Sequence, residues 1–237
     1  MCLMCELFAL SCNRKDSAAF SLPLFARYHS PYWDGWGVGY YVGTHARVVR
    51  NIDDPNYSET FRHAVQKARS NIIIAHIRLA TSGDVCPENC HPFRYRYLNR
   101  DWLFAHNGTI DIDYPSHVDG NNDSARAFSF MMDRIEEYMR GGRFRGIYPA
   151  VKYATRELLE TYGGDLNYLL SDSNALFAFC NHRRMYMLRR EKDYGGAILI
   201  STQKLTSENW VELPKNRVIC VLRGEIFDSV MWWMIEN

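Results

Sequence analysis

The sequence predicts an α+β protein built from two antiparallel sheets with helices packed outside them. Short apolar segments bounded by turn residues fill the chain up to residue 108, and such segments return after residue 166. Over residues 123–164 the apolar period changes from that of a strand to that of a helix. No repeat, low-complexity tract or long linker divides the chain. Strands, then two helices, then strands indicate a layered α+β domain.

The first half of the chain is expected to form strands. The isoleucine-rich segment 71–80 predicts a strand buried on both faces. The segment 101–108 ends at Asn107-Gly108, a pair that favours a tight turn. Alternating or β-branched apolar residues indicate the others. The expected strands of this half are 5–11, 38–43, 46–52, 71–80 and 101–108.

Two helices are expected next. Over residues 123–142 apolar side chains recur at helical spacing, Asp123 or Ser124 can cap the start, and Gly141 or Gly142 can end the helix. The second helix covers residues 147–164. The strand pattern then returns in five segments, at 167–172, 175–180, 184–190, 197–202 and 217–224.

The composition is that of a single globular domain spanning residues 1–237. With 28 basic and 27 acidic side chains, the net charge of +1 gives no reason to expect a nucleic-acid or membrane partner. No apolar run reaches the ~20 residues of a membrane-spanning helix, and the start does not have the pattern of a secretory signal. Seven unevenly spread cysteines do not suggest a disulfide framework, so we expect a cytoplasmic protein with reduced thiols.

Asn107 and Gly108 stand at the end of a predicted strand, where a side-chain amide and a backbone N–H can point at one oxygen. Two such donors stabilise an oxyanion in acyl transfer. Glycine suits this position because a backbone amide without a Cβ beside it can approach a ligand closely. A plain hairpin turn is the alternative explanation, since Asn-Gly is a common turn pair.

Arg78 follows a nearly unbroken apolar strand, so its charge is expected to meet an anion, either a substrate carboxylate or the partner of a salt bridge. His76, two residues earlier, is most simply a core histidine with its hydrogen bonds satisfied. Gly35, Gly37 and Gly39 space two aromatic residues. They indicate either a glycine-hinged loop beside a site or the start of a strand that contains bulges.

Cys2 and Cys5 each follow a methionine at the start of the chain. A thiol is a nucleophile only as thiolate, so a base must take its proton. His91 or His106 could serve. A cysteine that is first in its chain offers another base, its own α-amine, whose pKa is about 8. That chemistry requires the initiator methionine to be removed.

Together these stretches resemble the class II glutamine amidotransferases, which are N-terminal nucleophile hydrolases, and most closely the small stand-alone members whose chains begin Met-Cys-Glu-Leu. The resemblance implies the four-layer αββα sandwich and one amidotransferase domain over residues 1–237. A weaker resemblance continues in "NYLLSD" and "ISTQKLTSENWVELP". The stretches that carry it in order are "MCELFALS", "DGWGVGYY", "AHIRLATSG", "ENCHPF", "FAHNGTI" and "NNDSARAF".

The resemblance also implies a reaction. Cys5 would attack the carboxamide of glutamine, form a γ-glutamyl thioester and release ammonia, while Asn107 and Gly108 would form the oxyanion hole. No cofactor is needed for such chemistry. The ammonia would pass to a separate synthase partner or simply be released, and a small molecule, glutamine or a γ-glutamyl compound, would be the substrate.

The substrate head group would be held by three further residues. Arg78, helped by Thr81, would bind the α-carboxylate, and Asp123 would bind the α-ammonium. A zwitterion favours one cation and one anion facing it. The family often has an acidic residue two positions after this aspartate, where Ala125 stands here.

Three residues precede the family-like start, so either Cys5 or Cys2 could be the first residue of the mature chain. A slip of three residues would reverse the faces of the strand that contains Glu6, Leu7 and Phe8. Cys5 is therefore the preferred nucleophile.

Other functions fit parts of the sequence. A γ-glutamyl amide hydrolase would use the same site on a larger amide, and a non-catalytic binding protein could share the fold. A metal- or redox-binding module is a third alternative. Cys12, Cys180 and Cys220 are expected to be buried as small apolar residues. The side chains that could bind a metal are Cys2, Cys5, Cys86, Cys90 and His91.

Overall fold

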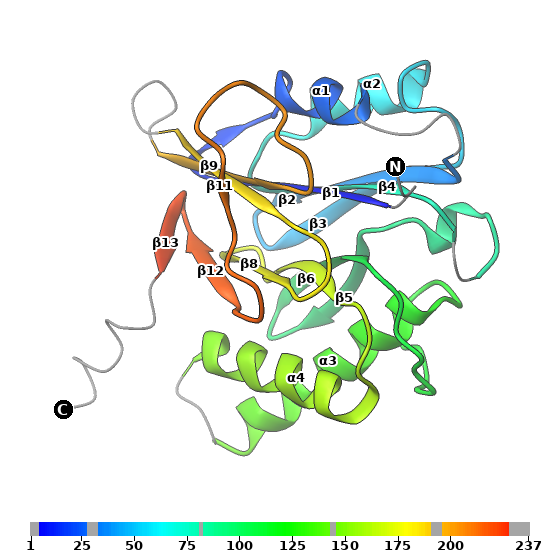
Figure 1. The fold of residues 1–237 in the computed structure, drawn as a ribbon, viewed down its shortest axis with the longest axis vertical. Helices are drawn as coiled ribbons and strands as arrows, with labels where there is room; N and C mark the ends of the chain where they lie inside the picture. Colours follow the sequence, from blue (N-terminus) through cyan, green and yellow to red (C-terminus); the bar gives the residue numbers. More distant parts are fainter. Residues whose placement is uncertain (1–4, 28–32, 81–82, 143–145, 191–195, 228–237) are drawn as a thin grey trace.

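Two antiparallel β-sheets lie face to face, and a pair of helices covers the outer side of each (Figure 1). This is the four-layer αββα sandwich that the sequence resemblance implied, and it confirms the predicted fold class. The computed structural model describes residues 5–27, 33–80, 83–142, 146–190 and 196–227. Within these ranges no helix is long and apolar enough to cross a membrane.

The first sheet has the strand order β11-β9-β10-β1-β4-β2-β3, so the strand nearest the start of the chain lies at its centre. Helices α1 (Ser21–Arg27) and α2 (Glu59–Lys67) pack on its outer face. Its strands are β1 (Glu6–Asp16), β2 (Gly35–Val42), β3 (His45–Asn51), β4 (Ser70–Arg78), β9 (Tyr186–Arg190), β10 (Ala197–Ser201) and β11 (Val211–Glu212).

The second sheet has the order β13-β12-β8-β7-β6-β5. Helices α3 (Asp123–Arg140) and α4 (Ile147–Tyr162) cover its outer face, and a short 3-10 helix, η1 (Pro87–Asn89), precedes its first strand. Its strands are β5 (Phe93–Tyr97), β6 (Arg100–Asn107), β7 (Asn167–Ser171), β8 (Ala175–Cys180), β12 (Ile219–Leu222) and β13 (Glu225–Phe227).

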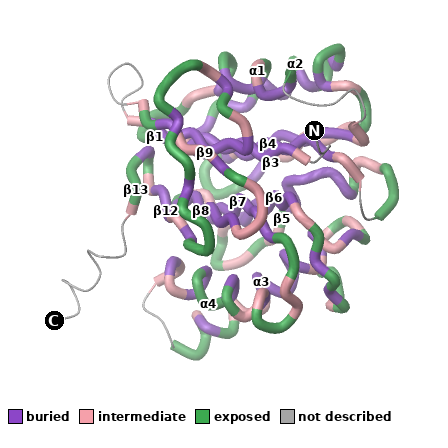
Figure 2. Tube along the Cα trace, in the orientation of Figure 1, coloured by how far each residue is buried: buried purple, intermediate pink, exposed green. Residues whose placement is uncertain are grey.

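Strand alternation decides which side chains of β1 enter the space between the sheets. Leu7 and Ala9 belong to the apolar cluster that both sheets share, whereas Phe8 and Leu10 pack under α1 and α2. Figure 2 shows the resulting buried layers in purple.

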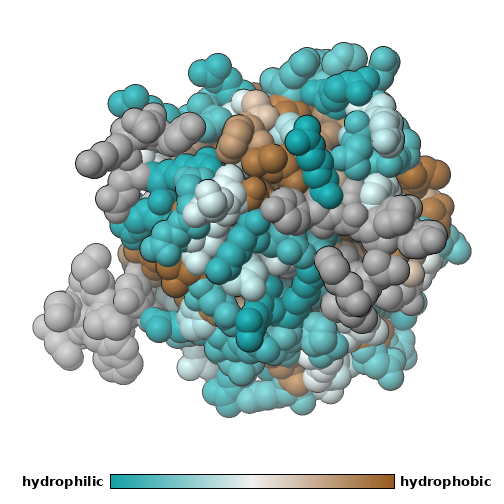
Figure 3. Space-filling model, turned by 45° about the horizontal axis from the view of Figure 1, so that its top comes forward, coloured by the Kyte–Doolittle hydropathy of each residue, from teal (hydrophilic) through white to brown (hydrophobic). Residues whose placement is uncertain are grey.

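The surface is mostly hydrophilic on the face shown in Figure 3, and its apolar residues form small separate patches, the most prominent of them at the upper centre of the view. Large apolar residues that remain exposed include Phe20 and Tyr57. Scattered exposed apolar residues of this kind are normal for a folded protein.

The start of α3 differs from the prediction, because neither Asp123 nor Ser124 is its N-cap. Asn122 caps the helix, and its side chain accepts the backbone N–H of Ala125 at 2.9 Å. Asp123 lies inside the first turn and accepts the backbone N–H of Ile110 at 3.0 Å. One carboxylate oxygen of Asp123, Oδ2, is therefore hydrogen-bonded to the chain that leads from β6 into the helix.

Gly35, Gly37 and Gly39 lie in the regular strand β2 rather than in a hinged loop, and the pairing of β2 with β4 runs without a bulge. The reason for glycine is close approach. A Cβ at Gly37 would lie 2.0 Å from the carbonyl oxygen of His91, because the segment 90–92 crosses the strand there. Backbone crossing backbone at this distance requires glycine.

Candidate active site

The ends of three strands bring the sequence-predicted residues together at one edge of the sandwich. Cys5 immediately precedes β1, Arg78 is the last residue of β4, and Asn107 is the last residue of β6. The antiparallel pairing of Glu6 with Ile77 places the start of β1 beside the end of β4. The second sheet supplies Asn107 from across the gap.

The Cys5 thiol is held by the backbone of Leu79. Its Sγ accepts the Leu79 N–H at 3.1 Å and lies 3.2 Å from the Leu79 carbonyl oxygen. Burial raises the pKa of this thiol to about 11, although the Leu79 backbone contact and the charge of Arg78 act in the opposite direction. At neutral pH the thiol is therefore protonated, and a base must remove its proton before it can attack.

Asn107 connects the two sheets at the thiol-bearing residue. It is 1% exposed, and its Nδ2 donates to the main-chain carbonyl oxygen of Cys5. The next residue, Gly108, has φ +148°, and a Cβ there would lie 1.9 Å from the carbonyl oxygen of Asp165. The chain then runs without regular structure to α3, so the Asn-Gly pair does not form a hairpin turn.

Arg78 is buried, at 2% exposed, and is anchored by the loop that follows β4. Its Nη1 donates to the carbonyl oxygen of Asp84 at 2.8 Å, and its Nη2 to that of Gly83 at 3.4 Å. The charges of Arg78 and Asp123 both act on the Cys5 thiol, the first lowering its pKa and the second raising it. A cation and an anion therefore lie within electrostatic reach of the same sulfur.

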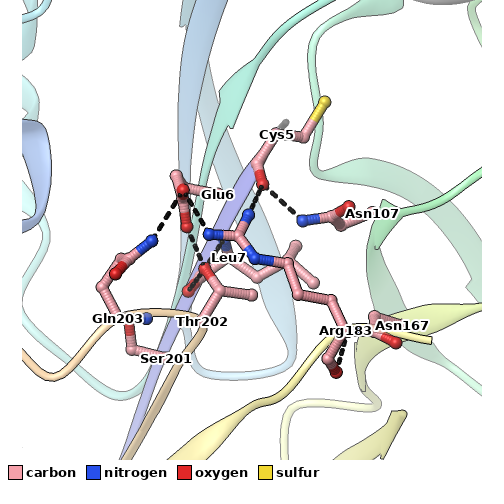
Figure 4. Close-up of polar contacts among 9 residues, drawn as sticks. All are labelled: Cys5, Glu6, Leu7, Asn107, Asn167, Arg183, Ser201, Thr202 and Gln203. Atoms are coloured by element: carbon pink, nitrogen blue, oxygen red, sulfur yellow. Dashed lines mark hydrogen bonds and ion pairs between the residues drawn. The ribbon is translucent and has the colours of Figure 1, made fainter. Parts of the chain in front are cut away.

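Sequence reasoning missed a network behind the thiol (Figure 4). Arg183, between β8 and β9, donates from Nη1 to the Cys5 carbonyl oxygen at 3.0 Å and from Nη2 to Glu6 Oε1 at 2.8 Å. The Glu6 carboxylate also accepts Gln203 Nε2 at 3.0 Å and the Thr202 hydroxyl. One signal was available, because a carboxylate on a buried strand needs a partner.

Three histidines near the site, His76, His91 and His106, are buried. The ring nitrogens of His106 contact Ser124 Oγ at 2.8 Å and the Asp165 carbonyl oxygen at 3.1 Å. The rings of His76 and His91 lie with centroids 4.2 Å apart and their planes tilted by 36°, and burial lowers the pKa of both. His76 is a core residue as interpreted, at 1% exposed, but in the described part of the chain neither ring nitrogen has a partner within hydrogen-bonding geometry.

The remaining cysteines are unpaired thiols where the structure describes them, and Cys12, Cys180 and Cys220 are buried as expected. In the same ranges no three His, Cys, Asp or Glu side chains are grouped so as to hold a metal ion. Two predicted site residues, Cys2 and Thr81, lie outside the described residues.

Residues 4–199 match the family of class-II glutamine amidotransferases, and this span contains all the strands that meet at the site. The chain belongs to the class-II glutamine amidotransferase family. YafJ of Escherichia coli K12, which has a provisional assignment as a glutamine amidotransferase, is 30% identical over 243 residues. The match covers 97% of this chain and 93% of YafJ, so the likeness extends over nearly the whole of both proteins.

The fold of this amidotransferase family member is shared with a solved structure, that of a predicted glutamine amidotransferase from Pseudomonas aeruginosa. The two agree with a TM-score of 0.67 at 24% identity, over 94% of this chain and 100% of the other. The N-terminal nucleophile hydrolase fold is therefore established for this chain.

A shorter segment of the chain is similar to a protein whose name gives a different activity. The γ-glutamyl-hercynylcysteine sulfoxide hydrolase of Mycobacterium tuberculosis is 38% identical over 79 residues, which are 33% of this chain and 32% of the hydrolase. This chain thus resembles, in one segment, a protein named for a larger γ-glutamyl substrate.

Proposed function

We propose that this protein is a cysteine amidohydrolase that cleaves the side-chain amide of glutamine and releases ammonia. The observation that carries the proposal is the position of Cys5. Its thiol lies at the start of the central strand, with an amide donor, Asn107, on one side and the opposite charges of Arg78 and Asp123 within reach. Membership of the class-II amidotransferase family supports the same reaction.

The base in this proposal is the α-amine of Cys5 in a chain that begins at that residue. With a pKa of about 8, the amine takes the thiol proton that burial otherwise retains. The sulfur then attacks the carboxamide carbon, and the carbonyl oxygen becomes an oxyanion. The proton passes to the amide nitrogen and the C–N bond breaks. Ammonia departs, and a γ-glutamyl thioester remains on Cys5.

The oxyanion is stabilised by Asn107 and Gly108. The Nδ2 group of Asn107 has two hydrogens, and the Cys5 carbonyl takes one of them. The second hydrogen and the Gly108 N–H form the donor pair for the oxyanion. Water, activated by the same α-amine, then attacks the thioester, expels the thiol and yields glutamate.

The glutamine head group is bound by opposite charges. Arg78 binds the α-carboxylate, with Thr81 assisting, and Asp123 binds the α-ammonium. Support comes from their placement, because both act on the thiol electrostatically from different elements, β4 and α3. We further propose that residues 1–237 form a single domain, that the protein is cytoplasmic and that the reaction needs no cofactor. A synthase partner would consume the ammonia.

The test combines the mature N-terminus with turnover. We expect N-terminal sequencing of the purified protein to start at Cys5, and ammonia release from glutamine to disappear in Cys5→Ala. Cys2→Ala is the matched control and should retain full activity. Full glutaminase activity in Cys5→Ala, or in a protein that begins with methionine, would exclude the proposed nucleophile.

A second candidate substrate is a larger γ-glutamyl amide. The segment shared with the mycobacterial hydrolase favours it, and the head group and the nucleophile would be unchanged. Comparing kcat/KM for glutamine with that for a panel of γ-glutamyl amides distinguishes the two. A preference for the larger amides by more than about tenfold, or ~1.4 kcal/mol, would make hydrolysis of such amides the main activity.

A further inference from the structure

The main-chain carbonyl of Cys5 accepts two hydrogen bonds from different parts of the protein. Asn107 donates from the end of β6, and Arg183 Nη1 donates at 3.0 Å from the connection between β8 and β9 (Figure 4). The thiol of the same residue is held separately by the Leu79 backbone. The carbonyl and the side chain of Cys5 are thus fixed independently of each other.

Such anchoring matters most for a first residue. Chain termini fray unless they are tied down, and a first residue has a peptide bond on one side only. Its geometry is then set by rotation about Cα–C and by χ1. The two donors to the carbonyl fix the first rotation, and the Leu79 N–H to Sγ favours one value of the second. Together they determine where the α-amine lies relative to the thiol.

Arg183 is itself held in place. Its Nη2 is paired with Glu6 Oε1 at 2.8 Å, and only 21% of the Arg183 side chain and 6% of the Glu6 side chain are exposed. Its carbonyl oxygen accepts Asn167 Nδ2 at 2.7 Å, which fixes the backbone as well. Thr202 and Gln203, just after β10, hold the Glu6 carboxylate. The guanidinium therefore reaches the Cys5 carbonyl from a rigid support.

We propose that Arg183, anchored by Glu6, is a positioning residue for the Cys5 nucleophile. The inference rests on the proposed function, in which the α-amine and the thiol of Cys5 must cooperate. Arg183 contacts the main chain behind the reacting atoms rather than the substrate, so its loss should slow the chemical step more than it weakens glutamine binding. A 1 Å misplacement of a reacting group can cost about 100-fold in rate.

Arg183 also places a positive charge near the α-amine. Removing it takes away a cation close to the amine, which favours the protonated ammonium form of the amine. The acidic limb of the kcat/KM pH profile should then move to higher pH. Three charges act on the Cys5 thiol, those of Arg78, Glu6 and Asp123, and only Glu6 loses a partner in such a variant.

The test compares Arg183→Met, Arg183→Lys and a neighbouring control, Arg184→Met. Arg184 has an exposed side chain that pairs only at the surface, 3.5 Å from Glu212. We expect kcat for glutamine to fall roughly 10- to 100-fold in Arg183→Met, with KM within about threefold of the parent. Arg183→Lys should recover part of the rate, because an ammonium can replace only part of the two-pronged contact. Arg184→Met should match the parent.

Three further readouts keep the test decisive. Thermal unfolding identifies a variant that fails to fold. If Arg183→Met fails to fold, the kcat and KM of Arg183→Lys are compared with those of the parent instead. A folded Arg183 variant with the parent kcat and the parent pH profile would overturn the inference. Failure of the proposed function is seen separately, as activity that survives in Cys5→Ala. If glutamine is not turned over at all, alkylation of Cys5 by iodoacetamide still reports positioning: an equal rate in the parent and Arg183→Met would also overturn it.

Discussion

The side-chain amide of Asn107 donates to the main-chain carbonyl of Cys5, a residue 102 positions earlier in the sequence. This contact joins the second sheet to the first at the edge where the candidate site lies. Its position means that one side chain serves both the anchoring of Cys5 and, in the proposed reaction, the stabilisation of the oxyanion.

Asn107→Ala should therefore reduce kcat for glutamine strongly, by roughly 100- to 1,000-fold, because removal of an oxyanion donor has that effect in acyl transfer. Asn107→Asp is the matched variant: it keeps the shape but replaces the donor by a negative charge near the thiol. Steady-state ammonia release measures both. Near-parent activity in the alanine variant would contradict the oxyanion assignment.

Gly108→Ala should destabilise the fold. The added Cβ would lie 1.9 Å from the Asp165 carbonyl oxygen, at a φ of +148° that L-residues avoid. We expect a loss of about 3 kcal/mol in the free energy of unfolding, measured by urea denaturation. Gly142→Ala is the control, since Gly142 also has a positive φ, +63°, but nothing lies within 4 Å of the added Cβ. Equal losses in the two variants would contradict the steric explanation.

Arg78→Lys tests the head-group assignment. A lysine keeps the charge but has no planar fork for a carboxylate, and it loses the paired contacts to the Asp84 and Gly83 carbonyl oxygens. We expect kcat/KM for glutamine to fall roughly 10- to 100-fold, or ~1.4 to 2.7 kcal/mol, chiefly through KM. A change confined to kcat would place Arg78 outside the binding of the substrate carboxylate.

The histidine pair predicts a pH-dependent stability. Burial lowers the pKa of His76 well below its usual value, so below a pH of about 6.5 the unfolded chain takes up a proton that the folded protein does not. The contribution of this histidine to stability is complete above that pH and is lost as the pH falls. His76→Phe should remove up to about 1.4 kcal/mol per pH unit from the slope below pH 6.5.

Urea denaturation between pH 5 and pH 8 measures that slope, with His63→Gln, an exposed residue of α2, as the control. At pH 7.5 the phenylalanine variant should be at least as stable as the parent, because the two unpartnered ring nitrogens are removed. An unchanged slope in His76→Phe would assign the pH dependence to other groups.

The sequence predicted the elements whose apolar period is long enough to recognise. The Ile-rich segment became β4, and the helical spacing after residue 123 became α3. Helix α1 escaped prediction because it has only seven residues and contains Pro23. Helix α2 escaped because its apolar face consists of three residues, Phe61, Ala64 and Val65. Both depend on the sheet beneath them rather than on their own pattern.

The site was predictable only where its residues stand in recognisable stretches. Cys5, Arg78 and Asn107 lie at or near the ends of predicted strands, and the folding of those strands places them at one edge. Arg183 stands 178 positions from Cys5 in a segment with no pattern of its own, and nothing local to it indicates a partner. The predicted N-cap of α3 was wrong for a similar reason. The carboxylate of Asp123 accepts the N–H of Ile110, 13 residues earlier, which the pattern around the helix start does not indicate.

The central place of β1 has a consequence for the order in which a newly made chain becomes competent. During synthesis Cys5 leaves the ribosome 178 residues before Arg183, and β10 and Thr202 follow later still. Until those residues emerge, the front of the polypeptide has one neighbouring strand and no support for its carbonyl. A nascent chain thus exposes the Cys5 thiol long before the residues that anchor the Cys5 carbonyl are made.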